Sequence, residues 1–412
     1  MIKATQRLPG PFLRMWTADA LSSAGDGFTL IAAPLLLVTL TSSPILIAGG
    51  VFASQIPWLL FGLHAGAIVD KTDQRKLIMA VDLVRALLMA GLAVAVFTDA
   101  ASVALVYLLL FASGIGDTMV MTAGIALVPA LVPRSLMTRA YSRLVATRLI
   151  GASLIARPLG AWLFTRDASI PFAVDALSFL GGVLLLARVP SPARPTVDNA
   201  GEPKPDDGGV RGGLRLLWRD RVLRVLALCI FVMNVTLSAT LAVLVLYAGE
   251  RLGLGPTGYG LLGAATAVGG LAGSVVVDRL VARVGTRLLL IIGLAIECGT
   301  QLILAITTSP WVAAFVLAVF GVHSSVWTVL TVSLRQHRTA DEVRGRVSSA
   351  YTVLSVSGSA IGALLGGTLV ELGGITTPMW VGAACVAGVF ALAIPNLRAD
   401  EVRLETPEGV SR

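Results

Sequence analysis

The sequence predicts an all-α membrane protein with twelve transmembrane helices in two six-helix, pseudo-symmetric halves. Three observations lead to this prediction: an apolar composition, twelve apolar segments, and a charged loop motif that occurs twice. Hydrophobic residues make up 56% of the 412 residues and charged residues only 14%, whereas a soluble protein carries about 25% charge. With a mean hydropathy of +0.84, the composition indicates a polytopic membrane protein.

Twelve segments are long and apolar enough to cross a bilayer, which takes roughly 20 mostly apolar residues. The sixth of them, Ile170 to Ala187, is the shortest. The segments begin near Leu13, Ile45, Leu77, Val103, Ala140, Ile170, Val222, Gly258, Leu288, Trp311, Val347 and Met379.

The basic residues alternate between loops rather than forming one patch, although the net charge is +8. This distribution argues against a nucleic-acid partner. Every second loop carries the excess of Lys and Arg, and such loops are cytoplasmic. We therefore expect a multi-pass protein of the bacterial cell (inner) membrane with both termini in the cytoplasm.

The expected domain boundaries follow from composition. Residues 1–190 and 216–398 are the two six-helix halves. Residues 191–215 are rich in Pro, Gly and Asp and are typical of a flexible cytoplasmic linker. The polar residues 399–412 form a flexible cytoplasmic tail.

A charged turn between segments two and three contains Gly66, Asp70, Lys71, Arg75 and Lys76. Gly66 and Asp70 are four residues apart and share a helix face, where a small residue lets another helix approach closely. The turn resembles the signature loop of the major facilitator superfamily, Gly-x-x-x-Asp-Arg/Lys-x-Gly-Arg-Arg/Lys.

A looser copy of this motif lies about two hundred residues further on, with Asp278 and Arg279 at its centre. Asp73 stands in the first copy where the family has glycine. Two copies indicate an internal repeat of two parallel halves. The resemblance implies that both copies gate the cytoplasmic side.

Segment one carries a polar stripe in which Asp19, Ser22, Ser23 and Asp26 share one helical face. A charged side chain inside a membrane costs roughly 2.5–3.5 kcal/mol on insertion scales, so it needs a partner, a wet cavity or a role. We expect Asp26 to carry the coupled proton and Asp19 to relay it. The alternative is that Asp26 only pairs with Arg157 or caps a break in the helix.

The resemblance implies that segments one, four, seven and ten line a central cavity. Segment four offers Asp117, the alternative proton carrier. Segment seven offers Asn234 and Ser238, and segment ten offers His323 and Trp327. We expect these four side chains to line the substrate cavity.

Segment five resembles the antiporter motif of drug exporters, whose core is Gly-Pro-x-x-Gly-Gly. Pro158 and Gly160 match it, whereas Arg157 replaces the first glycine and Ala161 the last. Arg157 is either half of a structural ion pair or a cavity residue that anchors an anionic group or tunes a nearby acid.

Three further acidic residues lie in the outer segments. Asp82 is expected to pair locally with Arg85, three residues on. Asp175 is expected to reach water near the outer end of segment six. The sequence suggests no partner for Glu297.

Three stretches, Ser23–Asp26, Asp175–Phe179 and Arg335–Arg346, resemble the macrolide and siderophore exporter branch of the superfamily. The resemblance implies a secondary transporter that exports amphiphilic small molecules by alternating access, driven by inward proton flow. The alternatives are a narrow-range siderophore or metabolite exporter, a proton-coupled importer and a non-transporting sensor. We expect no enzymatic activity and no cofactor; the expected partners are a small-molecule substrate, protons and the lipid bilayer, and the expected state is a monomer.

Overall fold

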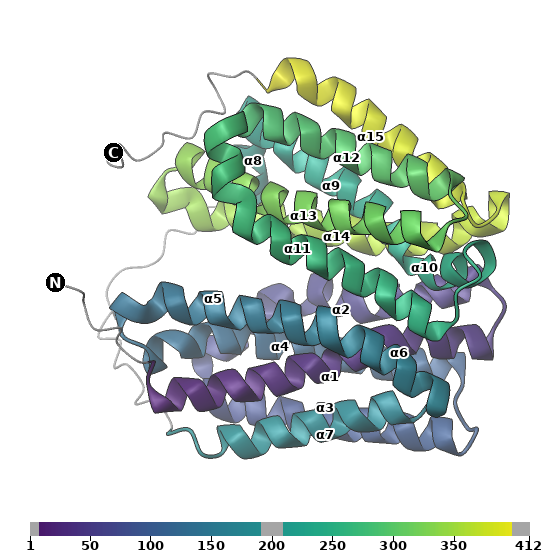
Figure 1. Ribbon diagram of the computed structural model, residues 1–412. Coiled ribbons are helices and arrows are strands. Elements are labelled where there is room, and N and C mark those ends of the chain that lie inside the picture. The colour runs from purple at the N-terminus through teal and green to yellow at the C-terminus, as the bar shows by residue number, and fades with distance from the viewer. Residues whose placement is uncertain (1–7, 191–208, 398–412) are drawn as a thin grey trace. The chain divides into compact units, whose positions relative to one another are not determined.

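The computed structural model describes residues 8–190 and 209–397 (Figure 1). Within these ranges all regular structure is helical. Eleven helices are long and apolar enough to cross a membrane, and α7 (Ile170–Leu186) is a shorter apolar helix. The prediction of an all-α membrane fold with about twelve spans, the sixth being the shortest, is therefore confirmed.

The N-terminal unit is a bundle in which α1 packs against α7 and α3 packs against both α4 and α7. α2 lies along α4. Contacts also group Gly253–Ala264 with this unit. Its helices are α1 (Gly10–Leu40), α2 (Pro44–Lys71), α3 (Gln74–Phe97), α4 (Val103–Leu131), η1 (Arg134–Leu136), α5 (Met137–Arg148), η2 (Leu149–Ala156), α6 (Arg157–Arg166) and α7.

The C-terminal unit repeats this plan: α9 packs against α14 and α15, and α12 packs against α13 and α15. Its elements are α8 (Gly209–Arg219), α9 (Arg221–Ala242), α10 (Leu244–Leu246), η3 (Tyr247–Arg251), α11 (Pro256–Val284), α12 (Thr286–Ile306), α13 (Pro310–Arg338), α14 (Asp341–Gly373) and α15 (Thr377–Asn396). The first half of α11, up to Ala264, groups with the other unit.

The expected linker lies mostly outside the described residues, as does the expected tail. Its last part, 209–215, is not loose: it forms the beginning of α8, which packs against α14. A side chain at Gly213 would collide with the backbone of Arg346. Glycine is therefore needed for this close approach, and the helical half begins before residue 216.

The two copies of the charged motif have matching structural roles. Arg75, the second residue of α3, donates hydrogen bonds to the carbonyl oxygens of Leu186 and Ala187 at 2.9 and 2.8 Å. Arg287, the second residue of α12, donates to the carbonyl of Leu397 at 2.6 Å. Each arginine thus binds carbonyls at the C-terminal end of the last long helix of its unit, where free carbonyls need donors.

The residue before α3 and the residue before α12 start their helices in different ways. Asp73 caps α3, since its side chain accepts a hydrogen bond from the backbone N–H of Lys76 at 3.1 Å. Gly285 occupies the same place before α12 with a φ of 82°, a conformation that glycine adopts without strain. The aspartate that departs from the family pattern is therefore a helix cap with ordinary backbone geometry.

The fifth span changes its helical pitch. A π-helical stretch, η2, separates α5 from α6 and ends just before Pro158. Proline has no N–H to donate to the preceding turn. The wider π-helical turn accommodates the loss of this backbone hydrogen bond. π-helical turns are frequent at functional sites.

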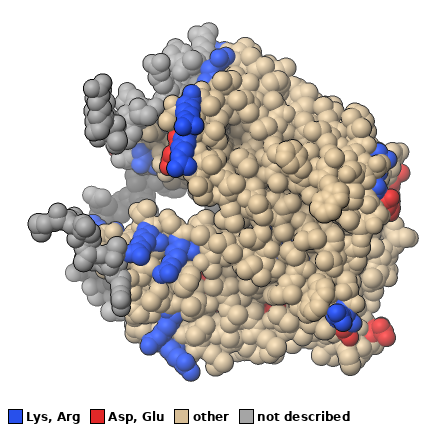
Figure 2. Space-filling view, viewed as in Figure 1, with Lys and Arg blue, Asp and Glu red and all other residues tan. Residues whose placement is uncertain are grey.

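Charged side chains are sparse on the face shown in Figure 2, where Lys and Arg gather toward the ends of the helices. The broad area between these ends is made of uncharged residues. Such a belt is what a bilayer's hydrocarbon core requires.

Candidate functional site

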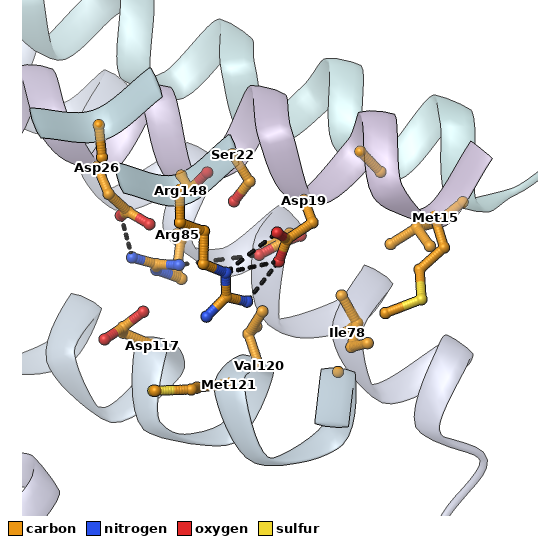
Figure 3. A pocket seen from close by; sticks show the side chains of 16 residues that line it. Met15, Asp19, Ser22, Asp26, Ile78, Arg85, Asp117, Val120, Met121 and Arg148 are labelled. Atoms are coloured by element: carbon orange, nitrogen blue, oxygen red, sulfur yellow. Dashed lines mark hydrogen bonds and ion pairs between the residues drawn. The ribbon is translucent and has the colours of Figure 1, made fainter. Parts of the chain in front are cut away.

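An ion pair between α1 and α3 lies at the centre of the polar interior of the N-terminal unit (Figure 3). Arg85 donates from Nη2 to Oδ1 of Asp26 at 2.5 Å. The arginine side chain is 4% exposed, whereas the aspartate side chain is 34% exposed. The cation is therefore fixed in the protein, and its carboxylate partner remains reachable.

Arg85 is held on several sides. Its Nε donates to the hydroxyl of Ser113 on α4 at 3.3 Å, and its guanidinium lies 4.3 Å from the ring centroid of Phe179 on α7. Asp82 is 3.9 Å away and fully buried. The predicted Asp82–Arg85 pair is therefore present, but it is looser than the Asp26–Arg85 pair that the sequence did not suggest.

A second ion pair lies nearer the start of α1. Asp19 accepts two hydrogen bonds from Nε of Arg148 on α5, at 3.0 and 3.2 Å, and one from Nη2. This pair is partly exposed, with the arginine side chain 35% and the aspartate side chain 12% accessible. A bidentate arginine fixes the carboxylate's orientation but leaves it in contact with solvent.

Asp175 was expected to reach water, and the structure shows this to be wrong. Only 1% of the residue is exposed. The hydroxyl of Thr29 donates to its carboxylate at 2.5 Å, and the hydroxyl of Ser178 does so at 3.4 Å. α7 packs along α1, so the face carrying Asp175 is buried between the two helices.

Two cavities meet at the Asp26–Arg85 pair, and both are lined by Asp117 as well. The first, here called the acidic cavity, has a volume of about 220 Å³ and also contacts Asp19, Asp82 and Arg148. The second, here called the apolar cavity, has a volume of about 340 Å³ and is lined mainly by α1, α2 and α4. Asp117 is exposed and accepts no hydrogen bond in Figure 3.

Arg157 lines the apolar cavity together with Asp26 and Asp117. It does not form the pair with Asp26 considered from the sequence, because Arg85 occupies that carboxylate. Its Nε is buried without a hydrogen-bond partner among the described residues. An unused donor in a largely apolar cavity is a place where a ligand's oxygen can bind.

Contacts inside the C-terminal unit involve three of its predicted cavity residues, Asn234, His323 and Trp327. Asn234 accepts a hydrogen bond from the hydroxyl of Ser359 on α14 at 3.0 Å, and Ser238 is 7% exposed. His323 and Trp327 are each 4% exposed and pack edge to face at 5.8 Å. All four lie on α9 and α13, where the sequence put them, and three of the four are buried.

The predicted gating residues lie at helix ends. Asp70, Lys71 and Lys76 are exposed, as are Asp278 and Arg279 in the second copy.

The two motif glycines differ. No described atom lies within 4 Å of where a side chain at Gly66 would begin, so the close approach expected there is not made in this structure. At Gly273, a side chain would lie 2.6 Å from the carbonyl oxygen of Val322.

Sequence reasoning missed Arg85 and Arg148 as partners of the two aspartates on α1. The sequence did contain one indication of these pairs. An acidic residue inside a span requires a cationic partner, and both arginines lie within predicted spans. What the sequence could not provide is which helix faces which. The described residues contain no group of three His, Cys, Asp or Glu side chains placed to hold a metal ion.

Chemically, the carboxylate of Asp26 can exchange one positively charged partner for another. A proton on Asp26 removes the charge that holds Arg85, and a cationic ligand can compete for the same carboxylate. Because Arg85 is bound on other sides, Asp26 is the member of the pair that can change partner.

Comparisons with known proteins identify relatives over nearly the whole chain. The model of the family described as transmembrane secretion effector matches residues 9–408. The multidrug efflux pump Tap of Mycolicibacterium fortuitum is 27% identical over 409 residues, covering 94% of this chain and 97% of that protein. The enterobactin exporter EntS of Salmonella paratyphi A is 27% identical over 406 residues, covering 94% and 90%.

Among solved structures, the nucleoside transporter NupG superposes with a TM-score of 0.78 at 11% sequence identity. The match covers 94% of this chain and 100% of that one. At this identity the likeness concerns the fold alone.

Proposed function

The chain belongs to the transmembrane secretion effector family of the major facilitator superfamily, and we propose that it exports amphiphilic small molecules in exchange for protons. Relatives named for multidrug efflux and for enterobactin export support the outward direction. Alternating access between the two units is the proposed mode of transport.

The observation that carries the proposal is the Asp26–Arg85 pair at the junction of two cavities. An amphiphile needs apolar walls for its body and a charged group for its head. The apolar cavity provides the walls, and the reachable carboxylate of Asp26 provides the charge. Proton and cationic substrate then compete for one group, which is sufficient for exchange.

Asp19 and Asp117 complete the proposed proton path. Both line the acidic cavity with Asp26, and Asp19 is held by an arginine that is itself partly exposed. A proton can therefore pass from solvent at Asp19, through the acidic cavity, to Asp26. Asp117 lines both cavities and is the alternative carrier.

A second candidate is export of an anionic or oxygen-rich natural product. The unpartnered Nε of Arg157 in the apolar cavity favours it, since a buried arginine binds carboxylate and similar oxygens well. The relative named as an enterobactin exporter points the same way. A substrate with both a cationic and an acceptor group would use Asp26 and Arg157 together.

The proposed setting is the bacterial inner membrane, with a monomer as the working unit and both termini in the cytoplasm. Support comes from the basic residues at the charged motifs, which mark cytoplasmic loops. Arg75 and Arg287 tie these loops to the ends of α7 and α15, so the same end of each unit carries the positive charge.

The test is a panel of toxic compounds in a bacterial host stripped of its own efflux pumps. Expression of the chain is expected to raise tolerance and lower the intracellular level of at least one amphiphilic cation, such as ethidium. Cells expressing Asp26→Asn at equal membrane level are expected to match the empty vector. Raised accumulation on expression would show import and contradict the proposal.

A further inference from the structure

A buried acid and base face each other inside the C-terminal unit, on two helices that do not contribute to the site described above. Glu297 on α12 is 1% exposed and His323 on α13 is 4% exposed. Oε2 of the glutamate and Nε2 of the histidine are 3.5 Å apart. Neither atom has a hydrogen-bond partner within the described ranges.

The local sequence builds this contact. Gly293 precedes Glu297 by one helical turn and lies on the same face of α12. A side chain at Gly293 would begin 2.6 Å from both Cε1 and Nδ1 of His323. The glycine thus makes room for the imidazole, while Phe320 and Trp327 pack edge to face with it at 6.1 and 5.8 Å. These rings shield the pair from water.

The next polar group on α12 is satisfied elsewhere. Gln301, one turn beyond Glu297, accepts a hydrogen bond from the hydroxyl of Thr240 on α9 at 2.9 Å. No described residue, Gln301 included, donates a hydrogen bond to Oε2 of Glu297. In contrast to Asp26, the pair has no arginine beside it.

Other charged groups on the pair's own helices are distant. Arg287 is ten residues before Glu297, and Arg335 is twelve residues after His323, or about 15 and 18 Å along the helices. α11 contacts α13 through Val322 and Ser325, on a different face.

α15 carries no charged residue, and Cys298 donates to the carbonyl of Ala383. The remaining titratable or charged groups on the helices packed against α12 and α13 are Arg221, Arg224 and Cys229 of α9, Tyr259, Asp278, Arg279 and Arg283 of α11, Asp341, Glu342, Arg344, Arg346, Tyr351 and Glu371 of α14, and Cys385 of α15. Among the described residues, none of them is hydrogen-bonded to Oε2 of Glu297 or Nε2 of His323.

We propose that Glu297 and His323 form a binding site for one proton within the C-terminal unit, separate from the carboxylates of the N-terminal unit. With one proton the pair has no net charge, as glutamate with imidazolium or as glutamic acid with imidazole. With none or two protons it leaves a net charge in a buried apolar setting, which is strongly unfavourable. The shared proton also supplies the hydrogen bond that the two facing atoms lack.

The test is an NMR titration of the protein in nanodiscs with isotope-labelled histidine. The chain contains only three histidines, and His64 and His337 are exposed, so their signals serve as internal references. In Glu297→Gln, the imidazole of His323 is expected to bind its proton at least about tenfold more weakly than in the wild type. The signals of His64 and His337 are expected to stay where they are.

Thr240→Val is the matched control, since it removes a buried hydrogen bond one turn away without touching the pair. It is expected to leave the His323 titration unchanged, and Glu297→Asp is expected to restore part of the proton affinity. An unchanged His323 titration in Glu297→Gln would overturn the proposal. The measurement needs no substrate. It therefore tests the proton site independently of the proposed export activity, and either proposal can be contradicted while the other stands.

Discussion

Arg85 contacts two carboxylates, and the solvent exposure of each carboxylate decides how strongly it depends on the arginine. It lies 2.5 Å from Asp26 and 3.9 Å from Asp82, so distance alone would make Asp26 the more dependent partner. Asp26 is 34% exposed and water can replace the arginine, whereas Asp82 is 3% exposed and has an oxygen without a partner. Loss of Arg85 therefore leaves Asp82 as the stranded charge.

The first prediction concerns stability. Arg85→Met is expected to lower the unfolding temperature of the purified protein strongly, since removal of one member of a buried pair costs roughly 3–5 kcal/mol. Adding Asp82→Asn should recover part of this loss, and adding Asp26→Asn should recover less. Thermal unfolding followed by tryptophan fluorescence measures all three proteins.

Arg148→Met is the control for that series, because its pair with Asp19 is partly exposed and exposed pairs contribute little. Equal recovery by Asp26→Asn and Asp82→Asn would contradict the ranking of the two carboxylates by exposure.

At the scale of elements, close helix contacts position the charged residues. Gly27 follows Asp26 on α1 and faces η2. A side chain there would begin 2.7 Å from Cβ of Ala156 and 2.8 Å from Cα of Ala152. The contact joins the helix that carries the proposed proton site to the widened segment before Pro158.

The second prediction compares two glycines. Gly27→Ala is expected to separate α1 from η2 and lower ethidium efflux severalfold. Gly91→Ala on α3 is expected to leave efflux unchanged and to raise stability slightly, since nothing lies within 4 Å and alanine favours helix by roughly 0.5–1 kcal/mol. Efflux rates at matched expression provide the comparison; equal effects would show that the contact is not needed.

Much of this fold can be predicted from the sequence because length and composition identify membrane helices. The twelve segments, the short sixth span, the repeat and the polar face of α1 were all visible in that way. The helical start of α8 was not, since glycine and arginine there are equally typical of a linker. Helix partners were also hidden: Asp175 was misplaced, and the partners of Asp19, Asp26 and Glu297 depend on which faces meet.

For the whole molecule, the central claim is that Asp26 couples proton flow to transport. The acidic cavity and the apolar cavity both reach it, and its partner Arg85 is fixed by α4 and α7. A neutral side chain at this position should keep the cavities intact while removing the group for which proton and substrate compete. Transport would then lose its dependence on the pH gradient.

The decisive measurement is ethidium transport in proteoliposomes with and without an imposed pH gradient. The wild type is expected to transport faster with the gradient. Asp26→Asn is expected to show no acceleration by the gradient. Asp99→Asn is the matched control, since Asp99 is exposed and its φ of 54° suits asparagine equally well; it should behave as the wild type. Full acceleration in Asp26→Asn would contradict the proposed role and make Asp117 the carrier to test.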